Sequence, residues 1–193
     1  MHEVCARAPV LPVLVIEDSA QAVPLAETLV AAGLPVLEVT LRTPAALDAI
    51  AAMATVRGAV VGAGTVLSPS DLAAARAAGA GFAVSPGATP ALLDAAAGAD
   101  MPLMPGAVTA SEAMALQERG YDLLKFFPAE PSGGVAALAA LGGPLPGLRW
   151  CPTGGVSAAL APDYLALGNV VCVGGSWVAP PEMLRAGRLD EIA

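Results

Sequence analysis

The stretch "AVVGAGTVLSPSDLAAARAAG" (59–79) decides the fold, because it changes from one structural period to another within a few residues. Its first part, 59–66, is a short apolar run of Val, Ala and Gly, which is typical of a buried strand. Its second part, 68–79, is alanine-rich and carries Pro69 at its start, where proline suits the first turn of a helix. The stretch therefore predicts one strand–helix unit.

The same change recurs along the whole chain. Alternating strands and helices form a parallel sheet, and eight units without a long break favour a closed barrel over an open sheet. At 193 residues the chain suits one domain. The sequence therefore predicts a single-domain α/β fold over 1–193, a (β/α)8 TIM barrel. The expected strands are 10–16, 36–41, 59–66, 82–87, 102–107, 123–129, 149–155 and 170–177.

The composition excludes several classes of protein. Hydrophobic residues make up 56% and charged residues 13%, which indicates a packed core and not a disordered chain. The formal net charge of −8 argues against a nucleic-acid partner, because phosphate backbones need a basic face. Uncharged stretches are broken by Gly, Pro and Asn, and the N-terminus lacks a basic region followed by an apolar one. We therefore expect a cytoplasmic protein without a membrane span.

Cysteine and histidine usage limits the chemistry further. Cys5, Cys151 and Cys172 are an odd number without a CxxC spacing, so we interpret them as buried small side chains or a surface thiol. The single histidine, His2, falls at an end that we expect to be frayed. Ser-His-Asp catalysis and histidine-rich metal sites are therefore excluded. Acid–base chemistry would have to come from carboxylates, lysine or tyrosine.

Lys125 stands out in "YDLLKFFPAE" (121–130). Nine residues are Lys or Arg and eight of them are arginines, which leaves Lys125 as the only lysine in the chain. Burial is costly for an ammonium ion and disfavours its charged form. A neutral amine can attack a ketone and form a Schiff base. The alternative is a lysine that buries only its aliphatic stem and keeps its charge in water.

Other polar residues follow the predicted strand ends, where barrels carry their sites. In "VLEVTLR" (36–42), Glu38 and Arg42 share a strand face, as a proton shuttle beside an anion-binding arginine or as a plain ion pair. Thr65 could donate to a carboxylate and Pro86 could supply an apolar wall, although "GAGT" and "SPG" could equally be turns. Trp150 and Trp177 are interpreted as packing residues, and Glu112 and Glu118 as solvated charges on a helix.

Two glycine-rich segments end the seventh and eighth predicted strands, "PTGG" (152–155) and "GGSW" (174–177). Barrels frequently bind phosphate with the loops after these two strands, through backbone N–H groups at helix starts. Either segment alone would more often be a tight turn. Their joint occurrence at this corner predicts a phosphate site.

Seven motifs occur in one order and at the spacing of a known family. Together they resemble 2-dehydro-3-deoxy-6-phosphogluconate (KDPG) aldolases, class I aldolases of the Entner–Doudoroff pathway that also act on 4-hydroxy-2-oxoglutarate. The resemblance covers about Pro9 to Arg188. The motifs are "LEVTLRT", "GAGTVL", "SPG", "PGAVTASE", "LKFFPAE", "CPTGG" and "GGSW".

This resemblance implies cleavage of KDPG to pyruvate and D-glyceraldehyde 3-phosphate. Lys125 would form the Schiff base, and Glu38 would be the general acid/base that works through a bound water. Arg42 and Thr65 would hold the substrate carboxylate. Pro86 and Phe127 would shape the pyruvate pocket. Four further residues would bind the distal hydroxyl and phosphate: Thr153, Gly154, Gly155 and Ser176.

The resemblance also implies a reaction without metal or cofactor and a homotrimeric assembly. The chain stops at "LDEIA", earlier than the usual final helix of the family, so we expect a short closing helix. Two alternatives stay within the enzymes, namely a 4-hydroxy-2-oxoglutarate aldolase or a 2-dehydro-3-deoxy-6-phosphogalactonate aldolase. A third is a non-catalytic anion-binding barrel or assembly scaffold, against which the presence of Lys125 and Glu38 counts.

Overall fold

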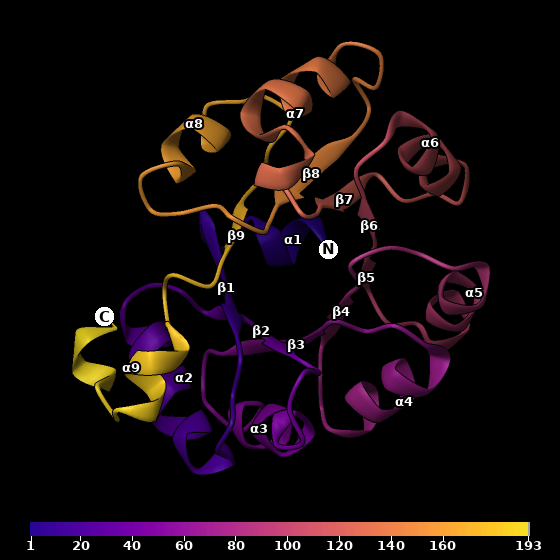
Figure 1. The fold of residues 1–193 in the computed structure, drawn as a ribbon. Helices are drawn as coiled ribbons and strands as arrows, with labels where there is room; N and C mark the ends of the chain where they lie inside the picture. The colour runs from indigo at the N-terminus through magenta and orange to yellow at the C-terminus, as the bar shows by residue number, and fades with distance from the viewer. Residues whose placement is uncertain (193) are drawn as a thin grey trace.

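The computed structural model describes residues 1–192, and within that range it confirms the predicted barrel. Short parallel strands form a curled sheet, and the helices surround it on the outside (Figure 1). The strands are β1 (Val10–Leu14), β2 (Val36–Thr40), β3 (Val60–Gly64), β4 (Phe82–Val84), β5 (Leu103–Met104), β6 (Gly106–Ala107), β7 (Leu123–Phe126), β8 (Arg149–Pro152) and β9 (Val173–Gly175).

The fifth predicted strand, 102–107, is divided into β5 and β6. β5 pairs with β4 in a ladder of six strands, whereas β6 pairs with β7 in a ladder of three. The division falls at Pro105, which has no N–H to donate, although its carbonyl accepts a hydrogen bond from the N–H of Lys125 at 2.9 Å. On the other side, bridges between Trp150 and Val170 and between Thr153 and Gly174 join β8 to the β9 segment. Together these contacts close the barrel.

The helices alternate with the strands as predicted, and the last two are short, as expected for the closing helix. The segment 157–167 forms a helix only over α8 (Ala161–Leu165), and 181–192 divides into α9 (Pro181–Arg185) and the 3-10 turn η3 (Leu189–Glu191). Gly187, with φ 67°, separates these two pieces. The other helical segments are η1 (Ser19–Gln21), α2 (Ala22–Ala31), α3 (Ala46–Met53), α4 (Pro69–Ala77), α5 (Pro90–Ala99), α6 (Ala110–Glu118), η2 (Glu130–Ser132) and α7 (Gly134–Gly142).

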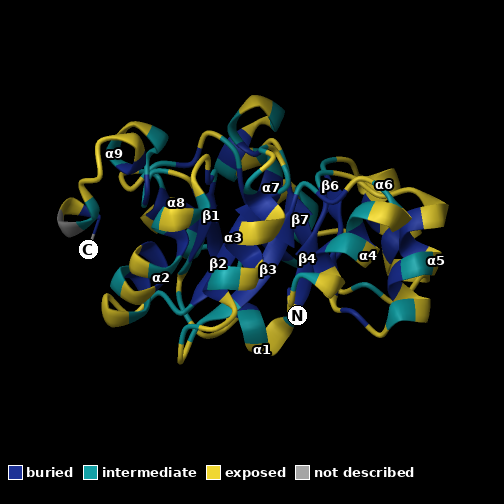
Figure 2. Ribbon diagram, turned by 90° about the horizontal axis from the view of Figure 1, so that it is seen from below, coloured by how far each residue is buried: buried dark blue, intermediate teal, exposed yellow. Residues whose placement is uncertain are grey.

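An additional helix, α1 (His2–Cys5), lies at the N-terminal end of the strands (Figures 1 and 2). The expected frayed end at His2 is therefore wrong, because His2 Nε2 lies 2.8 Å from Asp122 Oδ1 in a hydrogen bond. Cys5 at the end of α1 is buried among apolar side chains inside the barrel, together with Leu11 and Phe82. This helix therefore covers one end of the barrel.

Apolar side chains fill both the barrel and the layer between strands and helices, which leaves the exposed residues on the outer helices (Figure 2). Cys5, Cys151 and Cys172 are all free and buried inside the barrel, so the surface-thiol alternative is wrong. Trp150 is fully buried and meets Phe126 edge to face at 5.9 Å, which confirms it as a packing residue. No helix in residues 1–192 is long and apolar enough to span a membrane.

Candidate active site

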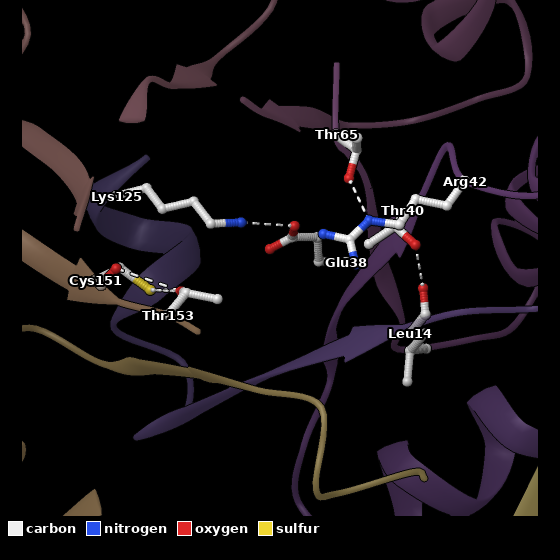
Figure 3. Close-up of polar contacts among 8 residues, drawn as sticks. All are labelled: Leu14, Glu38, Thr40, Arg42, Thr65, Lys125, Cys151 and Thr153. Atoms are coloured by element: carbon white, nitrogen blue, oxygen red, sulfur yellow. Dashed lines mark hydrogen bonds and ion pairs between the residues drawn. The ribbon is translucent and has the colours of Figure 1, made fainter. Parts of the chain in front are cut away.

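The centre of the site is a contact between Lys125 on β7 and Glu38 on β2, which face each other across the barrel (Figure 3). Lys125 Nζ lies 3.2 Å from Glu38 Oε1, and the exposed fractions of the two residues are 4% and 0%. The alternative of a lysine with its charge in water is therefore wrong. A buried ammonium ion beside a carboxylate can pass its proton to that carboxylate and become a nucleophilic amine.

The surroundings of the Lys125 amine and the Glu38 carboxylate are only partly polar. Glu38 Oε1 accepts from Lys125, while Glu38 Oε2 has no hydrogen-bond partner among the described residues. Phe127 lies beside the amine, with its ring centroid 5.1 Å from Lys125 Nζ. One face of the pair is thus apolar, and one carboxylate oxygen can accept a further donor.

Arg42 and Thr65 form the second part of the site. Thr65 follows directly on β3 and Arg42 is the second residue after β2, and Arg42 Nε donates to Thr65 Oγ1 at 3.1 Å (Figure 3). Thr65 adopts φ 59°, a left-handed conformation that is unfavourable for a β-branched residue. Such strain tends to concentrate at functional sites. The Arg42 guanidinium is exposed at the end of the strand, where it can meet an anion.

The third part is the segment Thr153–Gly155 after β8. Thr153 is buried, and its Oγ1 lies 2.1 Å from the point where a Cβ on Gly174 would be, so only glycine fits opposite it. Gly154 lies against Phe127, since a Cβ there would be 3.1 Å from that ring. The expected phosphate segment is therefore in contact with the side chain that flanks Lys125.

Pro86 and Ser176 are less closely joined to this centre. Pro86 and Phe127 both line a cleft of about 590 Å³ that extends between α5 and α6. Ser176 follows β9 and is exposed, and among residues 1–192 no hydrogen bond joins it to another predicted site residue.

The structure also adds residues for which no role was predicted. Thr40, on the same strand face as Glu38, donates to the Leu14 carbonyl at 3.0 Å and fixes β2 against β1. Glu130, from the quoted lysine motif, accepts a hydrogen bond from Tyr164. Glu112 was expected to be only a solvated charge on a helix. It instead caps α6 together with Thr109. The signal for this cap was present in "TASE", which has the spacing of a capping box.

A (β/α)8 barrel with a buried amine–carboxylate pair at its strand ends has the build of a Schiff-base aldolase. In the described residues, no group of three His, Cys, Asp or Glu side chains is arranged to hold a metal ion.

Comparison with known proteins agrees with this class. The family "KDPG and KHG aldolase" matches residues 1–193. The chain is 54% identical over 185 residues to the KHG/KDPG aldolase of Escherichia coli (strain K12). This match covers 95% of this chain and 87% of that relative. The chain therefore belongs to the KDPG and KHG aldolase family.

Two solved structures show the same fold at high identity. The 2-keto-3-deoxy-6-phosphogluconate aldolase of Zymomonas mobilis ZM4, solved with 3-phosphoglycerate, is 52% identical with a TM-score of 0.91, over 93% of this chain and 86% of that one. The KDPG aldolase from Legionella pneumophila, solved with pyruvate captured as a covalent carbinolamine intermediate, is 45% identical with a TM-score of 0.96. The match covers 99% of this chain and 93% of that one.

Proposed function

We propose that this protein is a class I aldolase that reversibly cleaves KDPG to pyruvate and D-glyceraldehyde 3-phosphate. The observation that carries the proposal is the buried contact of 3.2 Å between Lys125 Nζ and Glu38 Oε1. The carbinolamine of the Legionella relative is the first product expected when an amine adds to the pyruvate carbonyl. The enzyme is accordingly a carbon–carbon lyase.

The chemistry begins with transfer of a proton from Lys125 to Glu38. The neutral amine attacks the C2 carbonyl of KDPG to give a carbinolamine. Glu38 returns its proton to the carbinolamine hydroxyl, which leaves as water and gives a protonated imine, so that Glu38 is again a carboxylate. Glu38 then removes the proton of the C4 hydroxyl, directly or through a water bound at Oε2. The electrons of the C3–C4 bond flow into the imine, and glyceraldehyde 3-phosphate leaves. Protonation of the enamine at C3 and hydrolysis release pyruvate and restore Lys125.

Binding roles follow from the three parts of the site. We assign the substrate carboxylate to Arg42 and Thr65, because a guanidinium and a hydroxyl are donors suited to it. Pro86 and Phe127 form the apolar side of the pyruvate pocket. The distal hydroxyl and phosphate fall to the segments after β8 and β9, which are Thr153, Gly154, Gly155 and Ser176.

A second substrate, 4-hydroxy-2-oxoglutarate, is favoured by the KHG/KDPG name of the Escherichia coli relative. It shares the pyruvate half on which Lys125 and Glu38 act and lacks the phosphate. Assays with this compound, KDPG and the phosphogalactonate epimer rank the substrates. A folded protein that turns over none of them would favour the alternative of a non-catalytic anion-binding barrel.

We further propose a homotrimer of single-domain chains, 1–193, that works in the cytoplasm. Exposed apolar side chains support an assembly, because Leu67 and Met114 are large hydrophobic residues with exposed fractions of 58% and 52%. Light scattering coupled to size exclusion measures the assembly directly. A monomer at micromolar concentration would contradict the trimer without affecting the assigned chemistry.

Trapping of the imine tests the mechanism. The protein is incubated with pyruvate and borohydride, and the reduced adduct is located by peptide mass spectrometry. Because Lys125 is the only lysine, the adduct is expected on its peptide and absent from Lys125→Arg, with the N-terminal amine as an internal control. An adduct found only at the N-terminus of the folded protein would refute the class I mechanism.

A further inference from the structure

Glu130 and Tyr164 form a hydrogen-bonded pair behind the expected phosphate segment, and we call this pair the strut. Tyr164 belongs to α8 and is fully buried, and its hydroxyl donates to Glu130 Oε1. Glu130 begins η2, only five residues after Lys125. None of the catalytic steps above uses either side chain.

The residue Glu130 is joined to the phosphate segment through its backbone. The Glu130 N–H donates to the Gly154 carbonyl at 3.0 Å, and the adjacent Ala129 N–H donates to the Thr153 carbonyl at 2.8 Å. These two bonds tie the segment after β7 to the segment after β8. A displacement of Glu130 would therefore displace Gly154.

The side chain of Glu130 also packs against the same segment. A Cβ built on Gly155 would lie 2.7 Å from Glu130 Cβ and 2.9 Å from Glu130 Cγ, so the aliphatic stem contacts the Gly155 backbone. Gly155 has φ 80°, a left-handed conformation that glycine adopts without strain. The stem therefore supports the backbone whose N–H groups are assigned to the phosphate.

The carboxylate of Glu130 has a defined place. Oε1 lies 3.2 Å from the position of a Cβ on Gly134, the first residue of α7, and a negative charge is favourable at the start of a helix. Burial, and secondly the hydrogen bond to Glu130, raise the pKa of Tyr164 well above its usual value. The hydroxyl thus stays protonated and remains a donor throughout the working pH range.

We infer that the strut positions the segment Thr153–Gly155 and thereby sets the affinity for the phosphate end of the substrate. This inference rests on the proposed function, which assigns the phosphate to that segment. Glu130 and Tyr164 are positioning residues, since neither contacts Lys125 or Glu38. Without the hydroxyl, the Glu130 carboxylate is free to turn, its stem no longer supports Gly155, and a negative charge moves next to a phosphate site.

The test variant is Tyr164→Phe, which keeps the ring and removes only the hydroxyl. Its KM for KDPG is expected to rise about tenfold, the size of one lost hydrogen bond to a charged group. Exchange of the C3 protons of pyruvate, followed by NMR, needs Lys125 and Glu38 but no phosphate, and it is expected to stay unchanged. The matched control is Tyr121→Phe, because Tyr121 is the only other tyrosine and lies near α1 at the opposite end of the barrel.

Two substitutions of Glu130 separate positioning from charge. Glu130→Gln keeps an oxygen that accepts from Tyr164 and keeps the stem, so its KM for KDPG should stay near that of the wild type. Glu130→Ala removes both and should raise KM at least as much as Tyr164→Phe. Because pyruvate exchange reports a folded site, a raised KM at normal exchange cannot be ascribed to unfolding.

The outcomes are distinct. A raised KM for KDPG with normal pyruvate exchange in Tyr164→Phe, together with a near-normal Glu130→Gln, supports the strut. An unchanged KM, or an equal loss in KDPG cleavage and pyruvate exchange, overturns it while the proposed function stands. A wild-type protein that forms no Lys125 adduct and does not cleave KDPG overturns the proposed function, and the strut with it.

Discussion

The carboxylate of Glu38 occupies the space where any side chain on residue 64 would have to lie. A Cβ built on Gly64 would be 2.2 Å from Glu38 Oε1 and 2.7 Å from Glu38 Cγ. Glu38 Oε1 is the atom that accepts from Lys125. The glycine that ends β3 therefore determines where the carboxylate meets the amine, although it has no reactive group of its own.

Gly64→Ala is expected to lower kcat about 100-fold, because a displacement of roughly 1 Å in a reacting group has an effect of that size. Stopped assays of KDPG cleavage measure the loss, and circular dichroism checks that the fold is retained. The control is Gly98→Ala on α5, where a Cβ would meet nothing within 4 Å. Wild-type kcat in Gly64→Ala would show that the carboxylate can move without consequence.

Glu38→Gln is expected to reduce kcat by about 10²- to 10⁴-fold, the range for loss of a general acid–base group. The amide keeps the shape of the side chain but cannot take the C4 hydroxyl proton. The pyruvate–borohydride adduct at Lys125 should still form, but more slowly, since the amine remains in place and loses only the carboxylate that takes its proton. Retention of full kcat would move the acid–base role to another residue.

Arg42→Ala should raise the KM for KDPG and the apparent KM of pyruvate exchange by about tenfold, as expected for a lost charge-assisted hydrogen bond. Both ligands carry the carboxylate that Arg42 is proposed to hold, whereas only KDPG carries a phosphate. Arg57→Ala, in the exposed loop between α3 and β3, removes the same charge at the other end of the barrel and should leave both values unchanged. An effect on KDPG alone would reassign Arg42 to the phosphate.

Glu112→Gln should destabilise the protein at neutral pH and lose this effect in acid. Hydrogen bonds from the backbone N–H groups of Val108 and Thr109 to Oε2, at 3.0 and 2.9 Å, hold the pKa of Glu112 below its ordinary value of 4.5. A lowered folded pKa stabilises the native state above pH 4.5, and this stabilisation fades as the pH falls through the folded pKa.

Thermal unfolding between pH 3 and pH 7 tests this prediction, with the two Tm curves expected to converge as the pH falls through the lowered folded pKa of Glu112. Glu118→Gln removes the same charge from the last residue of the same helix, outside the capped first turn, so its curve should follow the wild type. A constant difference between Glu112→Gln and wild type at all pH values would refute the titration of the cap.

The sequence was sufficient to predict the barrel, because strand and helix periods alternate along the whole chain. It did not predict that the fifth strand, 102–107, breaks at Pro105. The pairing of β5 with β4 and of β6 with β7 is set by contacts between distant segments. α1 was missed for a related reason. A four-residue helix has little stability of its own, and this one is held by burial of Cys5 and by the contact between His2 and Asp122.

For the site, the sequence identified residues whose side-chain type is unusual for their place, above all Lys125 in an apolar strand. Residues that matter because they are small, or because they position another segment, carried no such signal in the sequence. Gly64 is one glycine among 21, and its role appears only when Glu38 on the neighbouring strand is in place. Glu130 and Tyr164 are 34 positions apart, and no local pattern joins them.

Glu38 and Lys125, the proposed reacting pair, belong to different ladders of the sheet, Glu38 to the ladder of six strands and Lys125 to the ladder of three. The contact between them exists only while the two ladders stay joined, at Pro105 between β5 and β6 and at the bridges between β8 and β9. The rate of catalytic turnover therefore reports whether the strands still form a closed barrel. During denaturant titration, activity should vanish as the ring opens, while helices and individual ladders still contribute to the far-ultraviolet spectrum.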